Sequence, residues 1–331
     1  MTGAVLVTGA AGGIGQLVVA ELVGAGLTVL TADRVDRYAP GVAGRHIGDL
    51  RDPAFVTECF AGPAATAAGG VDAVVHLAAV PAPGIVSEHD TLLFNTASAY
   101  LVCTEAGRRG VRRIVASSSF SAVGLAWADR DLSPHYVPVD ERHPSLTVDS
   151  YGLSKTFTEE IAAFTTRRFG VPTVCLRFPF AGTGERLRRH LDAVHHDPAG
   201  NRRDLWAWVD SRDVARAAHA ALTADLTGHH VLNIAAPDTA AVVPTRELLH
   251  RFHPRTAVRA ELGDHDGLID TRLAATVLGF ASAYSWRREP PAGPSAAPPV
   301  QNPAPSPLPA GGRVHHPGSD TLRSDDPGGN P

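Results

Sequence analysis

The sequence predicts an α/β protein whose core is a doubly wound parallel sheet with helices on both faces. Over the first 120 residues, short β-rich apolar runs alternate with segments of helical spacing. A glycine-rich turn joins the first apolar run to the first helical segment. The hydrophobic fraction is 44% and the charged fraction 19%, which is enough apolar material for a packed core. Strands that alternate with helices form parallel sheets with right-handed crossovers, hence the predicted class.

Each element follows from a local pattern. Strands are expected at short apolar or β-rich runs: Ala4–Thr8, Thr28–Thr31, Arg45–Gly48, Asp72–Leu77, Arg113–Ser117, Thr173–Arg177 and Val231–Ile234. Helices are expected where apolar residues recur at helical spacing: Ile14–Val23, Pro53–Phe60, Thr91–Arg109, Tyr151–Phe169, Asp213–Leu222, Arg246–Phe252 and Thr271–Leu278. From Gly182 to Asp204 the chain is polar, rich in Arg and His, and we predict no regular element there.

Composition divides the 331 residues into a folded part and a tail. Residues 1–289 are expected to form one unit, with a dinucleotide-binding core mainly in 1–180 and a small substrate lobe mainly in 181–289. The last 42 residues, 290–331, contain 12 prolines and almost no large apolar side chains. Such a segment buries too little surface to offset the entropy of ordering, so we predict a disordered tail.

Charge and cysteine content exclude several classes of protein. The formal net charge of −4 gives no general attraction to nucleic acid or to an anionic membrane. No apolar run approaches the roughly 20 residues of a membrane span, and the N-terminus lacks a basic leader. The three cysteines are widely spaced, which is typical of buried thiols in a reducing compartment. We therefore expect a cytoplasmic protein with a small-molecule substrate and neither a nucleic-acid nor a membrane partner.

A metal site is not expected either. Six of the 16 histidines stand in three adjacent pairs rather than at the spacing of ligands on a helix, and no acidic ligand set accompanies them: His195-His196, His229-His230 and His315-His316. Three arginines, Arg186, Arg188 and Arg189, are equally consistent with a carboxylate-binding group and with a solvated surface.

The glycine-rich turn has the spacing of a dinucleotide-binding fingerprint. In Thr8–Gly15, Gly9 permits a tight turn, Gly12 lets the backbone approach a pyrophosphate, and Gly15 allows close packing of helix on strand. Phosphates would then lie at the N-terminal amides of the following helix, where the helix dipole favours anions. The pattern predicts a Rossmann-type site for a dinucleotide.

An acidic residue at the end of the second strand indicates which dinucleotide binds. Asp33 can accept hydrogen bonds from the adenosine ribose, and its charge would repel a 2′-phosphate, which favours NAD. The neighbouring Arg34 leaves NADP open, because a guanidinium there could receive the 2′-phosphate.

One lysine among 30 basic residues suggests a position where arginine cannot serve. This lysine, Lys155, follows Tyr151 by four residues, so both side chains share one face of the predicted helix. An ammonium near the phenol, together with a cationic nicotinamide, would lower the pKa of the tyrosine toward working pH. The tyrosine could then exchange a proton with a substrate oxygen that Ser119, at the end of the fifth strand, also holds.

With these motifs the chain resembles the extended short-chain dehydrogenase/reductases, specifically the NAD-dependent epimerase/dehydratase family, over roughly residues 3–288. Further landmarks are Gly48–Asp52, His76–Ala79, Ser117–Ser119 followed by Gly124, Arg177–Pro179, Trp208–Ala215 and Asp270–Thr271. The resemblance implies that Ser119, Tyr151 and Lys155 are catalytic. It also implies NAD-binding roles for Gly9, Gly12, Ile14, Gly15, Asp33, Asp49, Leu50, Leu77, Ala78, Ala79, Asn95, Tyr151, Lys155 and Pro179.

Departures from the family pattern narrow the expected activity. The sugar-nucleotide dehydratases carry an Asp-Glu pair where this chain has Phe120 and Ser121, and sugar-nucleotide enzymes usually carry an asparagine where it has Phe180. The short lobe, with Arg202-Arg203-x-x-Trp206, is more similar to uronate dehydrogenases and related small-substrate members. Our leading hypothesis is therefore an NAD-dependent dehydrogenase or reductase acting on a secondary alcohol or ketone of a small polar, sugar-like molecule.

Two other functions stay open at this point. An epimerase would oxidise and re-reduce one carbon with bound NAD. A non-catalytic dinucleotide sensor would normally lack the Tyr or the Lys, and both are present. The resemblance also implies a homodimer in which the helices at 91–109 and 151–169 pair with those of a second subunit.

Overall fold

The computed structural model describes residues 3–37 and 40–288. Its main sheet has seven parallel strands in the order β10-β7-β5-β4-β1-β2-β3. The strands are β1 (Ala4–Thr8), β2 (Val29–Asp33), β3 (Gly44–Ile47), β4 (Val71–His76), β5 (Arg113–Ser117), β7 (Thr173–Arg177) and β10 (His229–Asn233). The order reverses direction at β1 and β4, which confirms the predicted doubly wound sheet.

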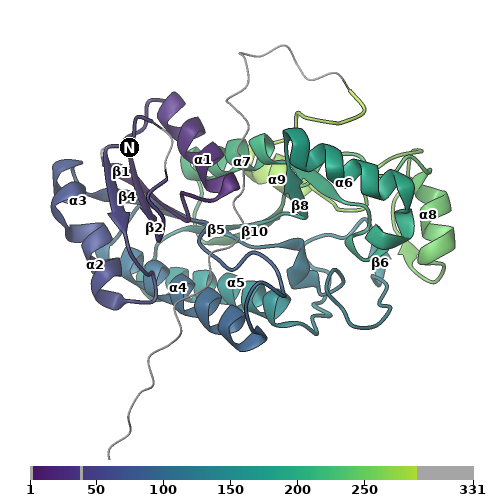
Figure 1. Ribbon diagram of the computed structural model, residues 1–331, viewed down its shortest axis with the longest axis horizontal. Helices are drawn as coiled ribbons and strands as arrows, with labels where there is room; N and C mark the ends of the chain where they lie inside the picture. Colours follow the sequence, from purple (N-terminus) through teal and green to yellow (C-terminus); the bar gives the residue numbers. More distant parts are fainter. Residues whose placement is uncertain (1–2, 38–39, 289–331) are drawn as a thin grey trace, which may run out of the picture.

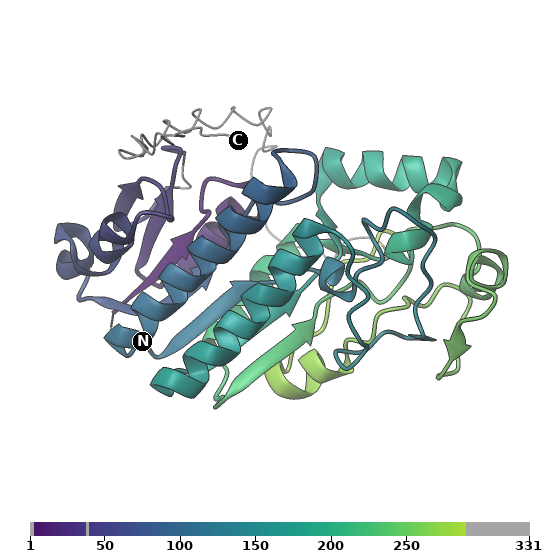
Figure 2. The same cartoon turned by 90° about the horizontal axis from the view of Figure 1, so that it is seen from below.

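Helices cover both faces of this sheet, as Figure 1 shows. The long helices are α1 (Gly13–Gly24), α4 (Glu88–Arg109), α5 (Ser150–Phe169), α6 (Gly184–His196) and α7 (Ser211–Thr223). The shorter ones are α2 (Pro53–Ala61), α3 (Pro63–Ala67), α8 (Thr245–Phe252) and α9 (Arg272–Leu278), with 3₁₀ turns η1 (Phe120–Val123) and η2 (Pro198–Asp204). Helices α1 and α7 pack on one face, while α4 and α5 lie side by side on the other (Figure 2).

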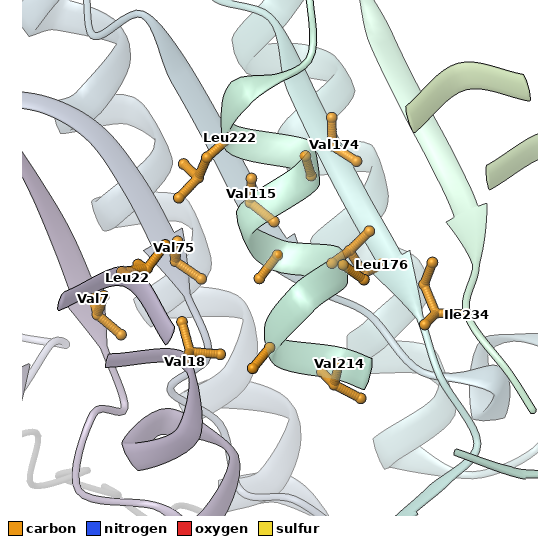
Figure 3. Packing of buried hydrophobic residues seen from close by; sticks show 14 of the residues in the cluster. Val7, Val18, Leu22, Val75, Val115, Val174, Leu176, Val214, Leu222 and Ile234 are labelled. Atoms are coloured by element: carbon orange, nitrogen blue, oxygen red, sulfur yellow. The ribbon is translucent and has the colours of Figure 1, made fainter. Parts of the chain in front are cut away.

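Strand residues alternate between the two faces, and each face has its own apolar core. Figure 3 shows the first core, between the sheet and helices α1 and α7. Its labelled side chains are Val18 and Leu22 from α1, Val214 and Leu222 from α7, and Val7, Val75, Val115, Val174, Leu176 and Ile234 from the strands and their ends. On the opposite face, Leu6, Val74 and Ile114 pack with α2 and α4. Strands buried on both faces explain the nearly continuous apolar runs in the sequence.

Helices α4 and α5 have defined ends. Ser87 caps α4 by accepting a hydrogen bond from the amide of Asp90 at 3.0 Å, and Gly110 ends it in the left-handed conformation with φ of 65°. Asp149 caps α5 through the amide of Gly152 at 2.7 Å. Helix α4 therefore begins three residues before the predicted Thr91. The predicted start of the other helix at Tyr151 is one residue from the observed Ser150.

A second part of the molecule projects beyond one end of the sheet. It contains α6, η2 and α8, and two short parallel pairs of strands: β8 (Phe180–Gly182) with β9 (Trp208–Asp210), and β6 (Tyr136–Val137) with β11 (Ala257–Val258). Trp206 and Trp208 are fully buried in its core. The stretch 181–289 is not all lobe, however, because α7 and β10 return to the main sheet.

The prediction of no regular element between Gly182 and Asp204 is wrong. Helix α6 and turn η2 occupy most of this stretch. Leu187, Leu191 and Val194 recur at helical spacing and pack on the lobe core, while arginines occupy exposed positions of α6. The many polar residues concealed this narrow apolar stripe. The predicted disordered tail, 290–331, lies outside the described residues.

None of the helices in residues 3–37 and 40–288 is both long and apolar enough to cross a membrane. Over the same residues, no group of three or more His, Cys, Asp or Glu side chains is arranged to hold a metal ion. One of the histidine pairs in the sequence, His315-His316, is not among the described residues.

Candidate active site

The glycine-rich turn lies where the carboxyl end of β1 meets α1. Gly9 has a positive φ of 71°, and a Cβ there would lie 2.6 Å from the amide nitrogen of Ala78. A Cβ on Gly15 would lie 2.1 Å from the carbonyl oxygen of Gly9. Both positions therefore require glycine, one for its backbone conformation and close approach and the other for packing of the helix on the turn. Gly12 is exposed and has more room, since its nearest contact would be 3.3 Å away.

The end of β2 is tied to this turn through Asp33. One oxygen of its carboxylate accepts a hydrogen bond from the amide of Ala11 at 3.0 Å, and the other accepts one from Val35 at 3.2 Å. The carbonyl of Asp33 accepts a hydrogen bond from Gly48 at 3.0 Å, which brings the segment with Asp49 and Leu50 to the same edge. Leu50 is buried, whereas Asp49 is half-buried.

Arg34, Arg51 and Phe94 lie at this end of the site, and only Arg34 has a role predicted from the sequence. The guanidinium carbons of Arg34 and Arg51 lie 5.5 and 5.4 Å from the ring centroid of Phe94 on α4. Arg51 also forms an ion pair with Asp49. Hydrogen bonds from Arg51 lower the pKa of Asp49, and the charge of Arg34 contributes. The signal for Phe94 was its place in the predicted helix one residue before Asn95, but sequence alone could not bring it opposite Arg34.

Asn95 uses its amide within the protein. Its oxygen accepts a hydrogen bond from the amide of Val80 at 2.7 Å, and its nitrogen donates to the carbonyl of Val80 at 3.1 Å and to the hydroxyl of Ser154 at 2.9 Å. Asn95 thus fixes the segment that follows β4, with Leu77, Ala78 and Ala79, against α5. Because these bonds use both the oxygen and the nitrogen of the Asn95 side chain, Asn95 would affect a cofactor indirectly, by positioning this segment.

Ser119, Tyr151 and Lys155 come together although they lie on three separate features of the fold. Ser119 follows β5 and caps η1 by accepting a hydrogen bond from Ser121 at 3.1 Å. Tyr151 stands in the first turn of α5, where the Ser119 hydroxyl is close enough to lower the pKa of its phenol. The Lys155 ammonium donates to the carbonyl oxygen of Ser117 at 3.0 Å and lies 5.7 Å from the centroid of the Tyr151 ring. Tyr151 and Lys155 are buried, at 8% and 4% exposure.

A tight loop brings Tyr151 to Ser119. Gly124 ends η1 with a positive φ of 91°, and a Cβ there would lie 2.1 Å from the amide nitrogen of Thr147. The amide of Leu146 donates to the carbonyl of Val123 at 2.8 Å. The chain that leads into α5 is therefore pressed against the turn that carries Ser119, which explains why a glycine follows the serine at this spacing.

Burial shifts the pKa values of these groups strongly. Burial, with a contribution from Asp149, raises the pKa of Tyr151 to about 12, and the hydrogen bond with Ser119 opposes this rise. Burial lowers the pKa of Lys155 to about 8, while Cys175 and Glu159 oppose the change. Among the chain's own groups, burial is the largest influence on the pKa of Tyr151. The lowering predicted from the sequence depends on Lys155 together with a cationic nicotinamide, and it stays a prediction.

A neutral histidine faces the lysine from β4. Burial, and secondarily the charge of Lys155, lower the pKa of His76 to about 3. Its Nδ1 lies 2.8 Å from the hydroxyl of Thr8 at the end of β1. His76 therefore stays uncharged at neutral pH and links the two central strands beside the glycine turn.

Comparison with known proteins identifies the family. The model of the NAD dependent epimerase/dehydratase family matches residues 5–235. The chain belongs to this family. Family members are NAD-dependent enzymes, among them dehydrogenases and epimerases, and NAD is the cofactor.

The relatives within the NAD-dependent epimerase/dehydratase family have two kinds of activity. The chain is 33% identical over 179 residues to a uronate dehydrogenase from Pseudomonas putida, covering 52% of this chain and 59% of the relative. It is 30% identical over 205 residues to a UDP-glucose 4-epimerase from Streptomyces lividans, covering 60% and 57%. The chain thus matches less than two thirds of the length of either relative. The structure of MoeE5 in complex with UDP-glucuronic acid and NAD is similar with a TM-score of 0.63, at 25% identity, covering 86% of this chain and 95% of that one.

On the lobe side, His190 and Arg186 pack against Phe180, the residue at the position where a resemblance to sugar-nucleotide enzymes would lead one to expect asparagine. The ring of Phe180 stacks on that of His190, with centroids 3.8 Å apart and planes 9° apart. The guanidinium carbon of Arg186 lies 4.9 Å from the centroid of Phe180. Burial lowers the pKa of His190 to about 4, so this group is neutral. Pro179, just before Phe180, is buried.

Two other arginines noted in the sequence pair with the loop before α5. Arg202 and Arg203 both contact the carboxylate of Asp131, at 2.7 and 3.5 Å. The Nε2 of His253 donates a hydrogen bond to the carbonyl of Arg202 at 2.9 Å, and its Nδ1 lies 2.9 Å from the hydroxyl of Ser133 in the same loop. These contacts join the lobe to the loop that separates Ser119 from Tyr151.

Proposed function

We propose that this member of the family is an NAD-dependent oxidoreductase that transfers a hydride to or from a secondary alcohol or ketone of a small polar, sugar-like substrate. The observation that carries the proposal is the buried group formed by Ser119, Tyr151 and Lys155 at the carboxyl edge of the sheet. Ligands of doubly wound folds bind at this edge, near the point where the strand order reverses.

The residues around the glycine turn fit NAD. Gly9 and Gly15 leave no room for a Cβ, so the turn lies close to Ala78 and to the first turn of α1. The N-terminal amides of α1, which include Ile14 and Gly15, suit a pyrophosphate. Asp33, with both oxygens held by backbone amides, suits the adenosine ribose, and Asp49 and Leu50 lie beside it. Asn95 would act on NAD indirectly, through the segment after β4. The other residues proposed to contact NAD are Leu77, Ala78, Ala79, Tyr151, Lys155 and Pro179.

When bound, NAD supplies the hydride acceptor or donor. Tyr151 acts as the acid/base: with a pKa near 12 its phenol is protonated at neutral pH and can donate a proton to a substrate carbonyl oxygen. In the opposite direction it takes the proton of the substrate hydroxyl, which requires a nearby positive charge to lower the pKa of the phenol. Ser119 holds the same substrate oxygen, and Lys155 keeps a positive charge next to the ring.

Uronic acids are the substrates to test first, because a uronate dehydrogenase is among the similar proteins. Oxidation would be followed by NADH absorbance with uronic acids, aldoses and cyclic polyols. An epimerase remains the second candidate, favoured by the similarity to UDP-glucose 4-epimerases. It would convert a UDP-hexose with no net NADH. A protein that binds NAD but turns over neither class would be a sensor.

Asp33 predicts the choice between the two dinucleotides. We expect NAD to bind at least ~10-fold more tightly than NADP, because the carboxylate would repel a 2′-phosphate. The guanidinium carbon of Arg34 lies 5.5 Å from the centroid of the Phe94 ring, at the same end of the site as Asp33. Titration of both dinucleotides by intrinsic tryptophan fluorescence measures the ratio. Equal affinities, or tighter NADP, would mean that Arg34 determines the specificity.

We also propose a homodimer through α4 and α5, which lie side by side on one face (Figure 2). Leu93 and Tyr100 on α4 and Phe157 on α5 are exposed by 50%, 42% and 43%. Exposed apolar side chains on adjacent helices are typical of an interface. Phe157→Glu is expected to convert the dimer to a monomer in light scattering, whereas Leu273→Glu on α9, a residue exposed by 40%, leaves it dimeric. A wild-type monomer at micromolar concentration would contradict the proposal.

A further inference from the structure

Glu159 is a buried acid that the proposed chemistry does not use. It lies on α5 one turn after Lys155 and two turns after Tyr151, so the three side chains share one face of the helix. That face is packed against the ends of β5 and β7. The side chain of Glu159 is only 10% exposed, whereas that of its neighbour Glu160 is 66% exposed.

The Glu159 carboxylate ties three elements together behind the site. The hydroxyl of Ser118, between Ser117 and Ser119, donates to one carboxylate oxygen at 2.5 Å. Arg177 at the end of β7 donates to both oxygens, at 2.6 and 2.7 Å. A buried ion pair is weak evidence of added stability, because an apolar pair of the same volume is often as stable.

Of the titratable groups around Lys155 that are described below, only Glu159 carries a negative charge at neutral pH. Cys175 on β7 has its pKa raised well above 9 by burial and is a neutral thiol, and His76 on β4 is neutral because its pKa is about 3. Tyr151 on α5 is a neutral phenol. On β5 the contacts are the carbonyl and hydroxyl of Ser117. Within the described residues, Glu159 is thus the carboxylate that acts on the Lys155 ammonium.

We propose that Glu159 is a positioning residue that keeps Lys155 charged and fixes the Ser117–Ser119 strand end through Ser118, with Arg177 orienting its carboxylate. The catalytic meaning of this role rests on the function proposed above. The electrostatic part does not, because it concerns only the protonation of one side chain. Without a nearby anion, burial of an ammonium favours its neutral form, and the hydrogen bond to the Ser117 carbonyl would then lose its charge.

The single lysine of the sequence allows a direct test. Untagged protein labelled with [ε-¹³C]lysine gives one resonance, and its chemical shift against pH reports the titration of Lys155. For the wild type we expect a midpoint at about 8. Glu159→Gln keeps the size and an acceptor for Ser118 but removes the charge, so its midpoint should fall by about one pH unit or more. Glu160→Gln removes the same charge from the exposed neighbouring position and should leave the midpoint unchanged.

Glu159→Gln leaves the Arg177 guanidinium unpaired, so a second variant guards against loss of the fold. In Glu159→Gln/Arg177→Gln both charges are removed, which avoids the larger cost of an isolated buried charge. The double variant should also show a lower midpoint than the wild type, by less than Glu159→Gln, because it loses the positive charge of Arg177 together with the negative charge of Glu159. An unchanged midpoint in the variants that lack Glu159, or an equal fall in Glu160→Gln, would overturn the proposal.

The kinetic measurement separates this proposal from the proposed function. With a substrate found in the panel, the loss of turnover in the variants lacking Glu159 should grow as pH rises through the lowered midpoint. A purely structural defect would lower turnover by the same factor at every pH. If no substrate is turned over but the midpoint falls as expected, the proposed function fails while the role of Glu159 on Lys155 stands.

Discussion

Replacing Tyr151 with phenylalanine is expected to lower turnover by roughly 10²–10⁴, the usual contribution of a positioned acid or base. The phenol is buried beside Ser119, and its pKa of about 12 makes it a proton donor at neutral pH. Phenylalanine keeps the ring and its packing but can neither donate a proton to the substrate oxygen nor accept one. The measurement is the rate of NADH formation or consumption at saturating NAD and substrate.

Binding of NAD supplies the internal control for this variant. The glycine turn and Asp33 are held by backbone contacts that do not involve Tyr151. We therefore expect Tyr151→Phe still to bind NAD in a fluorescence titration, with a much smaller loss of affinity than of turnover, and to keep its melting temperature within a few degrees. Turnover within a factor of three of the wild type would assign the proton transfer to another group.

The sequence predicted the sheet and its carboxyl edge well, because those features depend on local patterns. The run Ala4–Thr8 is apolar at every position except Thr8, which is what a strand buried on both faces requires. Gly9 is required by its backbone conformation and Gly15 by the close packing of the helix on the turn. The spacing of the glycines in the sequence predicts both requirements. Parallel strands then bring Asp33 and the residues after β4 and β5 to the same edge.

Contacts between distant segments could not be read in the same way. The stacking of Phe180 on His190 and the pairing of Asp131 with Arg202 join residues whose spacing carries no signal. Charge effects depend on burial as well: the sign of the shift at Tyr151 follows from its desolvation, which a Tyr-x-x-x-Lys motif does not reveal. The sequence places Glu159 in the predicted helix. Its hydrogen bond with Arg177 depends on how the end of β7 packs against that helix, which the sequence does not reveal.

Lys155 should not tolerate replacement by arginine, even though arginine keeps the positive charge. Lys155 is 4% exposed, and its ammonium donates to the Ser117 carbonyl at 3.0 Å, near His76, Cys175 and the Tyr151 ring. An arginine would place a broad planar group with five donors where a compact ammonium now fits. We expect Lys155→Arg to lose about 10²-fold or more in turnover, and about 10-fold in NAD affinity, because the resemblance to the family gives this lysine both roles.

Comparing Lys155→Arg with Lys155→Met separates shape from charge. Methionine is close to lysine in length and lacks the charge. Because burying an ammonium is costly, the Lys155→Met protein should be at least as stable as the wild type. If charge alone mattered, arginine would retain activity and methionine would not. We expect both variants to lose turnover, because the proposed role needs a positive charge placed against the Ser117 carbonyl. Methionine lacks the charge, and arginine cannot place its charge at the same point. Normal turnover by Lys155→Arg would mean that the one lysine of the sequence is an accident of composition and that the proposed mechanism is wrong.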